Sequence, residues 1–311
     1  MSPVVSVKNL TKAFGRHTIL EECALVVEEG EAYGLVGLNG AGKTTLIRLL
    51  LGVLRADKGE IAVLGENPWR HDALLHRRMG VVLDHDGLWG NLTFEQNMKI
   101  FAAAKGVSWS ASLSYMEEYW SRTNIYNNRK AVKFFSRGQR MQCALCRAFL
   151  GWPDLYFFDE PAVALDVDAY EHFKSLVMAA RKRGASFLIS SHQLDTIDDF
   201  ADRVGMLREK RLIELARKAE QGNRLWSLET DDNPRWATII REQCGGAPAF
   251  VEGEWQFEST HADTDIPVLI KRLAGAGCAI RKVAPIVRDF SVTIRNEYRR
   301  NAAEELHRGV T

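Results

Sequence analysis

The sequence predicts an α/β fold built around one strand, loop and helix, followed by a smaller α+β segment. Residues 32–36 form a short apolar run of buried-strand character, and residues 45–51 have the length and pattern of a helix that ends at Gly52. A second apolar run, 155–158, closes on two acids. We therefore expect an open α/β sheet with polar ligand-binding residues at the ends of its strands.

The loop between that first strand and helix has the spacing G-x-x-x-x-G-K-T over residues 37–44, the pattern of a phosphate-binding loop. Its glycines let successive backbone N–H groups face one centre, and the helix start adds partial positive charge, so the site favours anions. Lys43 is placed to reach the β- and γ-phosphates of a nucleotide, and the Thr44 hydroxyl to ligate Mg²⁺. A glycine-rich turn with a solvated lysine would not explain the flanking strand and helix, so a P-loop NTPase is predicted.

Length and composition exclude several other classes of protein. A chain of 311 residues can form two domains, and a formal charge of +1 gives no electrostatic reason to expect nucleic acid. No apolar stretch is long enough to span a bilayer, and residues 1–11 lack the pattern of a signal peptide. Five cysteines, an odd number without a framework spacing, suit a reducing compartment. We therefore expect a cytoplasmic protein without direct membrane insertion.

Cys143 and Cys146 form a C-x-x-C motif, a spacing that also serves metal sites and redox pairs. The motif lies within the helical pattern of residues 139–150 and has no second ligand pair nearby, so apolar packing is the favoured interpretation.

Three short β-rich runs, 4–10, 18–20 and 24–27, predict a small antiparallel sheet ahead of the loop. Phe14 lies in the expected turn between the first two runs. Its ring can stack on adenine, but an aromatic residue there can equally be an ordinary core or turn residue. The sequence leaves these two roles open.

Beyond the loop, the predicted elements are a strand within 56–65, a short basic helix at 70–78 and a buried strand at 80–83 that ends at Asp84. From 91 to about 150 the pattern is mostly helical, which we interpret as an insertion in the α/β unit with helices at 94–104, 109–122 and 139–150.

A Ser/Gly turn at 135–139 opens the last of these helices, so it too presents backbone donors at a helix N-terminus. A single ATP cannot readily use two such anion sites in one chain. This mismatch favours a dimer.

The apolar run 155–158 closes on Asp159 and Glu160. Asp159 is placed to hold Mg²⁺ directly or through water, and Glu160 to orient or deprotonate the water that attacks the γ-phosphate. Alone, such a pair is usually a strand end with surface charge; beside the phosphate loop the functional role is favoured. His192 follows an expected strand at 186–190 and either donates to a γ-phosphate or serves as a surface or capping residue.

In this combination and order, the motifs resemble those of an ATP-binding-cassette (ABC) ATPase, the nucleotide-binding subunit of an ABC transporter. The resemblance covers about residues 4–215. The matched positions are the adenine-stacking residue Phe14, Walker A at Gly37–Thr44, the signature motif at 135–139, Walker B at 156–159 with Glu160 as catalytic carboxylate, the D-loop at 164–166 and the switch histidine His192.

The resemblance implies an ATP hydrolase with a RecA-like core, an antiparallel β subdomain and a helical subdomain at about 91–150. The implied catalytic residues are Lys43, Glu160 and His192, and the implied Mg²⁺ ligands are Thr44, Asp84 and Asp159. The implied ATP-binding residues are Phe14, Gly37, Asn39, Gly40, Ala41, Gly42, Lys43, Thr44, Thr45, Ser136, Gly138, Gln139 and Asp166.

The resemblance also implies partners. In the family, two cassettes pack head to tail, with each ATP between the Walker A of one and the signature motif of the other. Closing this sandwich drives separate transmembrane permease subunits, and hydrolysis reopens it. We expect a homodimer, peripheral on the inner face of the cell membrane through the permease.

Two positions depart from the family pattern. Asp84 stands where the family usually carries a glutamine, and Arg137 replaces the first glycine of the signature motif. A carboxylate can still bind Mg²⁺, although it brings negative charge close to the triphosphate. Because neither change removes a catalytic group, we expect an active ATPase.

Residues 217–224 form a polar, charged junction, so we expect the cassette over 1–216 and an accessory domain over 225–311. The element order in 225–294 suggests a small ferredoxin-like α+β domain, similar to the appendage of ABC-2-type exporters. Its role is open between regulation and simply covering an edge or stabilising a dimer. A charged helix is expected at 298–308.

Two alternative functions stay open at this point. One is a soluble ABC ATPase that acts on nucleic acid or ribosomes, although neither a second cassette nor a basic stripe is visible. The other is an ATP-gated regulatory module with low turnover, suggested by Asp84. Cargo contacts would lie in the permease, outside this sequence.

Overall fold

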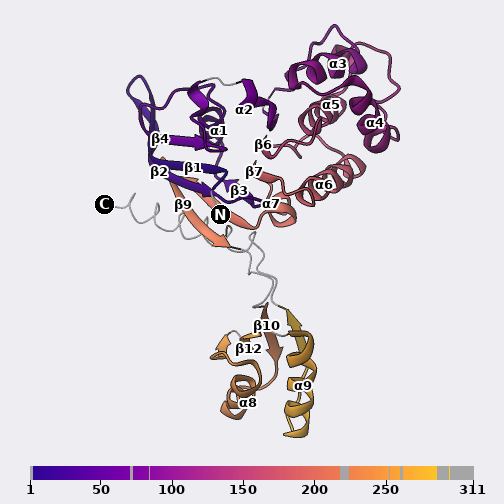
Figure 1. Ribbon diagram of the computed structural model, residues 1–311. Coiled ribbons are helices and arrows are strands. Elements are labelled where there is room, and N and C mark those ends of the chain that lie inside the picture. Colours follow the sequence, from indigo (N-terminus) through magenta and orange to yellow (C-terminus); the bar gives the residue numbers. More distant parts are fainter. Residues whose placement is uncertain are drawn as a thin grey trace. The chain divides into compact units, whose positions relative to one another are not determined.

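The computed structural model describes residues 3–70, 73–83, 85–217, 224–251, 253–259, 262–285 and 294 (Figure 1). The chain divides into two compact units, one up to Ala216 and one from Arg217 to Thr293. The predicted helix at 298–308 and Asp84 lie outside the described residues.

The first unit is built on a sheet of six strands in the order β5-β6-β7-β3-β8-β9. The pairs from β5 to β8 are parallel, which confirms the predicted α/β class. The strands are β3 (Ala32–Val36), β5 (Met79–Val82), β6 (Leu155–Asp159), β7 (Ser186–Ser190), β8 (Arg203–Arg208) and β9 (Arg211–Arg217).

Both faces of this sheet are covered, which explains why its strands are continuously apolar. Alternate residues of β6 point to opposite faces. Leu155 and Phe157 join one apolar cluster with α1 (Lys43–Leu50), whereas Tyr156 and Phe158 join another with residues of the helices on the other face. Those helices include α6 (Val167–Arg181), and α7 (Leu194–Phe200) follows β7.

A second, three-stranded antiparallel sheet has the order β2-β1-β4, formed by β1 (Val5–Phe14), β2 (His17–Val27) and β4 (Lys58–Val63). The two predicted runs 18–20 and 24–27 are one strand, because an irregularity with positive φ at Glu22 interrupts their pattern without ending the pairing. The expected turn at Phe14 was also wrong. Phe14 is the last residue of β1 and pairs with His17 across a tighter turn.

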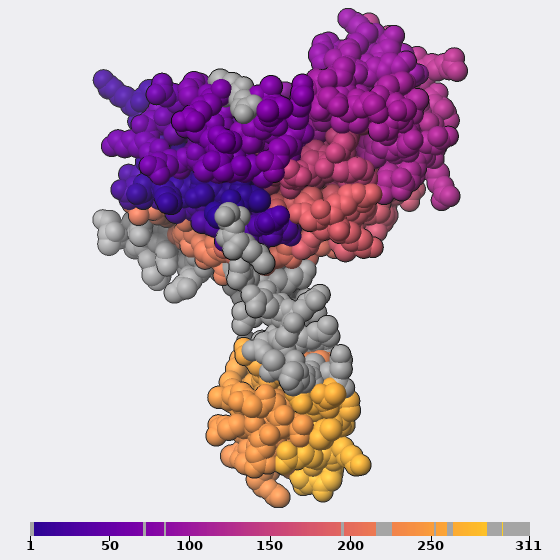
Figure 2. Space-filling model, in the orientation of Figure 1, coloured from indigo at the N-terminus to yellow at the C-terminus, as the bar shows by residue number. Residues whose placement is uncertain are grey.

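The predicted helical insertion is formed by α3 (Phe94–Lys105), α4 (Trp109–Trp120), the 3₁₀ turn η2 (Val132–Phe134) and α5 (Arg137–Phe149). The α3–α4 part forms a lobe of its own on the first unit, coloured purple in Figure 2. The predicted basic helix at 70–78 is instead a 3₁₀ turn, Pro68–Arg70, and the short helix α2 (Ala73–Arg77).

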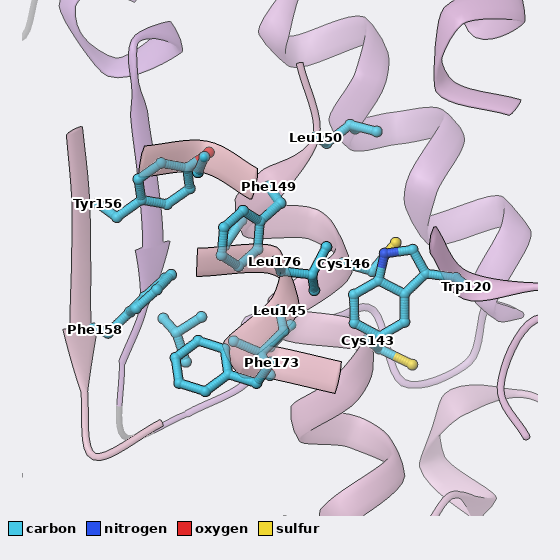
Figure 3. Packing of buried hydrophobic residues seen from close by; sticks show 14 of the residues in the cluster. Trp120, Cys143, Leu145, Cys146, Phe149, Leu150, Tyr156, Phe158, Phe173 and Leu176 are labelled. Carbon is cyan, nitrogen blue, oxygen red and sulfur yellow. The ribbon is translucent and has the colours of Figure 1, made fainter. Parts of the chain in front are cut away.

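The C-x-x-C cysteines lie on α5 among apolar side chains of β6, α4 and α6 (Figure 3). Cys143 and Cys146 are free, buried thiols, and burial raises the pKa of each above its ordinary value. Among the described residues no cluster of three metal-binding side chains exists. The prediction of apolar packing is therefore confirmed.

The second unit has a four-stranded antiparallel sheet in the order β11-β12-β10-β13. Its own apolar cluster includes Leu228, Trp236 and Phe257. The element order β-α-β-β-α-β is that of a ferredoxin-like fold. The elements are β10 (Arg224–Glu229), α8 (Pro234–Cys244), β11 (Ala249–Val251), β12 (Glu254–Ser259), α9 (Ala262–Gly275) and β13 (Lys282–Pro285).

Candidate functional site

The loop after β3 brings a buried cation to the start of α1. Gly42 is the N-cap of α1 with φ 108°, and no side chain caps it. A Cβ on Gly42 would lie 2.9 Å from a methyl group of Ile19, so glycine is required by both conformation and space. The N–H groups of the first turn are therefore available to an anion.

Lys43 lies directly after this cap and is 7% exposed. Its Nζ donates to the carbonyl of Gly37 over 2.8 Å and lies 3.8 Å from Oε1 of Glu160. The loop backbone thus holds the ammonium group in place. A phosphate oxygen arriving at the helix start would meet a positioned positive charge rather than a mobile one.

Asp159, at the end of β6, faces the first turn of α1 and is 3% exposed. Its carboxylate accepts a hydrogen bond from Oγ1 of Thr44 over 2.5 Å and another from the Ser190 hydroxyl. The Thr44 hydroxyl and the carboxylate are hard oxygen ligands beside a phosphate-binding loop. They suit Mg²⁺, which is commonly held by one or two protein oxygens together with water and phosphate.

Glu160 follows Asp159 with φ 53°, a left-handed conformation uncommon for a residue other than glycine. Its backbone N–H donates to the Ser190 carbonyl over 3.0 Å. Its Oε2 lies 2.7 Å from Nδ1 of His192 and accepts from the His192 backbone N–H over 3.2 Å. The carboxylate is therefore held between Lys43 and His192, where it can orient a water molecule.

Lys43, Thr44, Asp159 and Glu160 line one cavity of about 290 Å³, and nine of its ten lining residues are sequence-predicted ones. Phe14 lies at this cavity with 49% of its surface exposed, so its ring is open to a flat ligand. The lining residues are Phe14, Ile19, Asn39, Gly40, Gly42, Lys43, Thr44, Thr45, Asp159 and Glu160. A second cavity of about 590 Å³ shares Asn39, Asp159 and Glu160, and it is also lined by His192 and by Arg137 at the start of α5.

The sequence matches the ABC transporter family over residues 20–163. It is 33% identical to the bacitracin transport ATP-binding protein BcrA of Bacillus licheniformis over 69% of this chain and 70% of that protein. The chain belongs to the ABC transporter family. It is therefore the ATP-binding subunit of a transporter and an ATP hydrolase, as predicted.

Two further similarities agree with this assignment. The cassette is 30% identical to the lantibiotic transport ATP-binding protein SrtF of Streptococcus pyogenes, over 68% of this chain and 89% of that protein. It also resembles a solved ATP-binding subunit of an ABC transporter, with a TM-score of 0.65 and 25% identity over 77% of this chain and 92% of the other. In the described part of this chain no helix has both the length and the apolar character needed to cross a membrane.

Six predicted ATP-binding residues do not line the 290 Å³ cavity. Four of them lie at the starts of α5 and α6: Ser136, Gly138, Gln139 and Asp166. Ser136 and Gln139 form a reciprocal capping box at the start of α5, with hydrogen bonds of 3.2 and 3.0 Å. A Cβ on Gly138 would lie 2.7 Å from the Ala164 carbonyl. Asp166 caps α6 by accepting from the Ala169 N–H over 2.9 Å.

The other two, Gly37 and Ala41, belong to the phosphate-binding loop and support it. Gly37 contributes its carbonyl to Lys43, and Ala41 packs against the apolar cluster around α1. Sequence reasoning missed Ile19 and Ser190. Ser190 could have been found from strand pairing, because the last residues of two neighbouring parallel strands, 159 and 190, lie side by side in register.

Proposed function

We propose that this chain is the ATP-hydrolysing subunit of an ABC exporter, which closes around ATP with a second cassette and drives a separate transmembrane permease. The observation that carries the proposal is the division of the predicted residues. Lys43, Thr44, Asp159 and Glu160 surround one cavity, whereas Ser136, Gly138, Gln139 and Asp166 do not line it. Such a site is incomplete until another molecule supplies the missing contacts.

In the bound state, the N–H groups at the start of α1 and the Lys43 ammonium group bind the β- and γ-phosphates. Phe14 stacks on the adenine ring. Thr44 and Asp159 hold Mg²⁺, which neutralises charge on the phosphates when it is bound. The predicted contribution of Asp84 to this site stays a prediction.

Glu160 orients the attacking water and accepts its proton, because its carboxylate lies beside Lys43 at the phosphate end of the cavity. Binding of the γ-phosphate competes with Glu160 for the Lys43 ammonium group, which frees the carboxylate for water. His192 holds the opposite oxygen of Glu160, and its ring can donate to the γ-phosphate.

The second cassette supplies Ser136, Gly138, Gln139 and Asp166 to the nucleotide, and a second copy of this chain is the simplest source. Its Ser136 turn presents a hydroxyl group and a helix start, both of which favour an anion. Once the cleaved phosphate has left, the negative charge that held the two surfaces together is reduced, and the pair separates.

The proposed location is the inner face of the cell membrane, where the chain is held by its permease. BcrA and SrtF are named for the transport of bacitracin and of a lantibiotic. We propose a cargo of that antibiotic class for this chain as well. Deleting its gene should then make the native host more sensitive to such a compound. Unchanged sensitivity to bacitracin and to a lantibiotic would exclude this cargo.

The transporter role is tested by purifying the native complex from detergent-solubilised membranes and measuring phosphate release with and without the permease. We expect co-purification of a membrane protein and faster ATP turnover in the complex. Recovery of the chain with ribosomes or nucleic acid, or ATP binding without turnover in either form, would contradict the proposal.

A further inference from the structure

The aromatic ring of Phe14 has a cation over it. Lys12 precedes Phe14 by two residues in β1, so both side chains lie on the same face of the strand. Nζ of Lys12 lies over the Phe14 ring, 5.3 Å from its centre. Phe14 lines the 290 Å³ cavity, whereas Lys12 does not. The ammonium group therefore covers the side of the ring that is turned away from the cavity.

Asp57 fixes the position of this ammonium group. Its Oδ1 accepts from Nζ of Lys12 over 3.0 Å, and its Oδ2 accepts from the backbone N–H of Ala13 over 2.7 Å. The bond from Ala13, and then the bond from Lys12, lower the pKa of Asp57 below its ordinary value. The Lys12 side chain is only 12% exposed. The cation is thus held by a charged partner rather than moving freely in solvent.

The same aspartate joins the end of β1 to the start of β4. The pairing of these strands ends at Thr11 and Lys58, and the backbone N–H of Asp57 donates to the Thr11 carbonyl over 3.0 Å. Beyond that point the Asp57 side chain takes the place of a further strand residue, because it bonds the Ala13 N–H. The backbone that leads directly into Phe14 is therefore fixed by a turn more than forty residues further along the chain.

A fixed ring should bind a flat ligand more tightly than a mobile one. Phe14 is the last residue of β1, and ordering a half-exposed side chain at such a place on binding costs free energy. With the cation over one face, the other face is left for the ligand. The phosphates of a nucleotide would meet Lys43 instead. The contact between Lys12 and Phe14 should consequently act on the base alone.

We propose that Lys12 and Asp57 are positioning residues that hold the Phe14 ring for the adenine base, and so set the part of the ATP affinity that comes from the base. This inference rests on the proposed function, since it takes Phe14 as the residue that stacks on adenine. Neither Lys12 nor Asp57 lines the cavity, so neither is placed to touch the nucleotide.

Lys133 provides a matched control, because it repeats the same arrangement away from the cavity. Its Nζ lies over the Phe134 ring, 5.2 Å from the centre, and donates to Oδ1 of Asn91 over 3.0 Å. Neither Lys133 nor Phe134 lines the 290 Å³ cavity. Lys133→Met therefore removes the same kind of contact without affecting Phe14.

The experiment measures the affinities of a non-hydrolysable ATP analogue and of inorganic triphosphate, each with Mg²⁺, by calorimetric titration. The ratio of the two affinities isolates the contribution of the nucleoside. In Lys12→Met the affinity for the analogue should fall about three- to fivefold, while that for triphosphate stays within about 1.5-fold. Lys12→Arg, which keeps a cation over the ring, should retain most of the affinity. Lys133→Met should match the wild type for both ligands.

A double-mutant cycle tests whether Lys12 acts through the ring. Phe14→Ala should lower the affinity for the analogue roughly tenfold and leave that for triphosphate unchanged. In the Phe14→Ala background, Lys12→Met should have no further effect. Asp57→Asn keeps an acceptor for the Ala13 N–H but loses the charge, so it should lower the affinity for the analogue about twofold. Combined with Lys12→Met, it should add nothing.

An equal fall in affinity for the analogue and for triphosphate in Lys12→Met would overturn the inference, because Lys12 would then act on the phosphates or on the fold as a whole. Wild-type affinities in Lys12→Met, an equal loss in Lys133→Met, or the same loss with and without the Phe14 ring would overturn it as well. Failure of the proposed function is distinct, because the wild type would then bind neither ligand.

Discussion

The starts of α1 and α5 are both helix N-termini placed to receive phosphate, yet they are built in opposite ways. Helix α1 begins at a glycine without a side-chain cap, next to a buried lysine. Helix α5 begins at an exposed serine whose side chain and that of Gln139 already satisfy two backbone donors. The first is therefore completed by a ligand, whereas the second is stable without one.

Because of this difference, we expect the two helix starts to contribute differently to ATP binding and to turnover. A ligand at α1 gains otherwise unused N–H groups and a fixed cation, so most of the binding free energy should come from this end. A ligand at α5 meets a preformed turn and gains little in affinity, but it joins two surfaces. We expect α1 to determine ATP affinity and α5 to determine closure and turnover.

The largest expected effect is that of Glu160→Gln, which leaves both helix starts intact. Removing a general base typically costs roughly 10²–10⁴-fold in rate, so kcat should fall by that order while ATP affinity stays within about threefold. Phosphate release and binding of a fluorescent ATP analogue measure the two quantities. Wild-type turnover in this variant would show that Glu160 is not the base.

Lys43→Ala tests the α1 end. Hydrogen bonds to charged groups contribute about 1.5–3 kcal/mol each, so affinity for the fluorescent analogue should fall roughly 10- to 100-fold. If affinity is unchanged, phosphate binding does not depend on this end and the comparison fails. Arg48→Ala, in the last turn of α1, is the control and should bind normally.

Ser136→Ala tests the α5 end. We expect kcat to fall about tenfold, equivalent to about 1.4 kcal/mol of transition-state stabilisation, with analogue affinity within twofold. Because a lost N-cap also costs about 1 kcal/mol of stability, Thr93→Ala is the matched control. Thr93 and Gln96 form the same capping box at α3, so this variant should lose similar thermal stability and keep its turnover. Equal losses of kcat in Ser136→Ala and Thr93→Ala would show that Ser136 acts only as a structural helix cap.

The smallest expected effect on turnover is that of Lys105→Met, which changes the opposite end of α5, where Nζ of Lys105 donates to the carbonyls of Ala148 and Leu150. Burial lowers the pKa of Lys105 to about 7 from an ordinary value of 10.5. Between these values the unfolded chain binds the extra proton, so the folded state gains stability as pH rises, by about 1 kcal/mol per pH unit. Lys105→Met should remove this gain, measured as the thermal midpoint from pH 7 to 9. If the pH profile of Lys105→Met is identical to that of the wild type, the lowered pKa of Lys105 is not the source of this pH dependence.

How well the sequence predicts a structural feature depends on how far apart in the chain the interacting residues lie. Residues 32–36 and 186–190 are strands with the expected bounds, because burial on both faces leaves a continuous apolar signal. The phosphate-binding loop was equally predictable from the sequence, because its glycines, Lys43 and Thr44 are contiguous in the chain. Helix α7 was missed, because seven residues with three acids carry almost no periodic signal.

Long-range contacts were the least predictable. Val81 and Asp86 contact Arg147 and Arg140, which lie more than fifty residues away in the chain, and nothing in the local pattern of either segment indicates the other. The merged strand β2 was missed for a related reason, since its pairing with β1 continues through an irregularity that breaks the alternation of side chains.

Ser190 contacts both acids of the site through different atoms. Its hydroxyl group reaches Asp159, and its carbonyl accepts from the backbone of Glu160. Replacing the Ser190 side chain would consequently change the electrostatics around Asp159 and the Mg²⁺ that it would hold. The position of Glu160 would not change, because it is fixed by the main-chain hydrogen bond. The two halves of the reaction can thus be adjusted separately, even though one residue keeps them aligned.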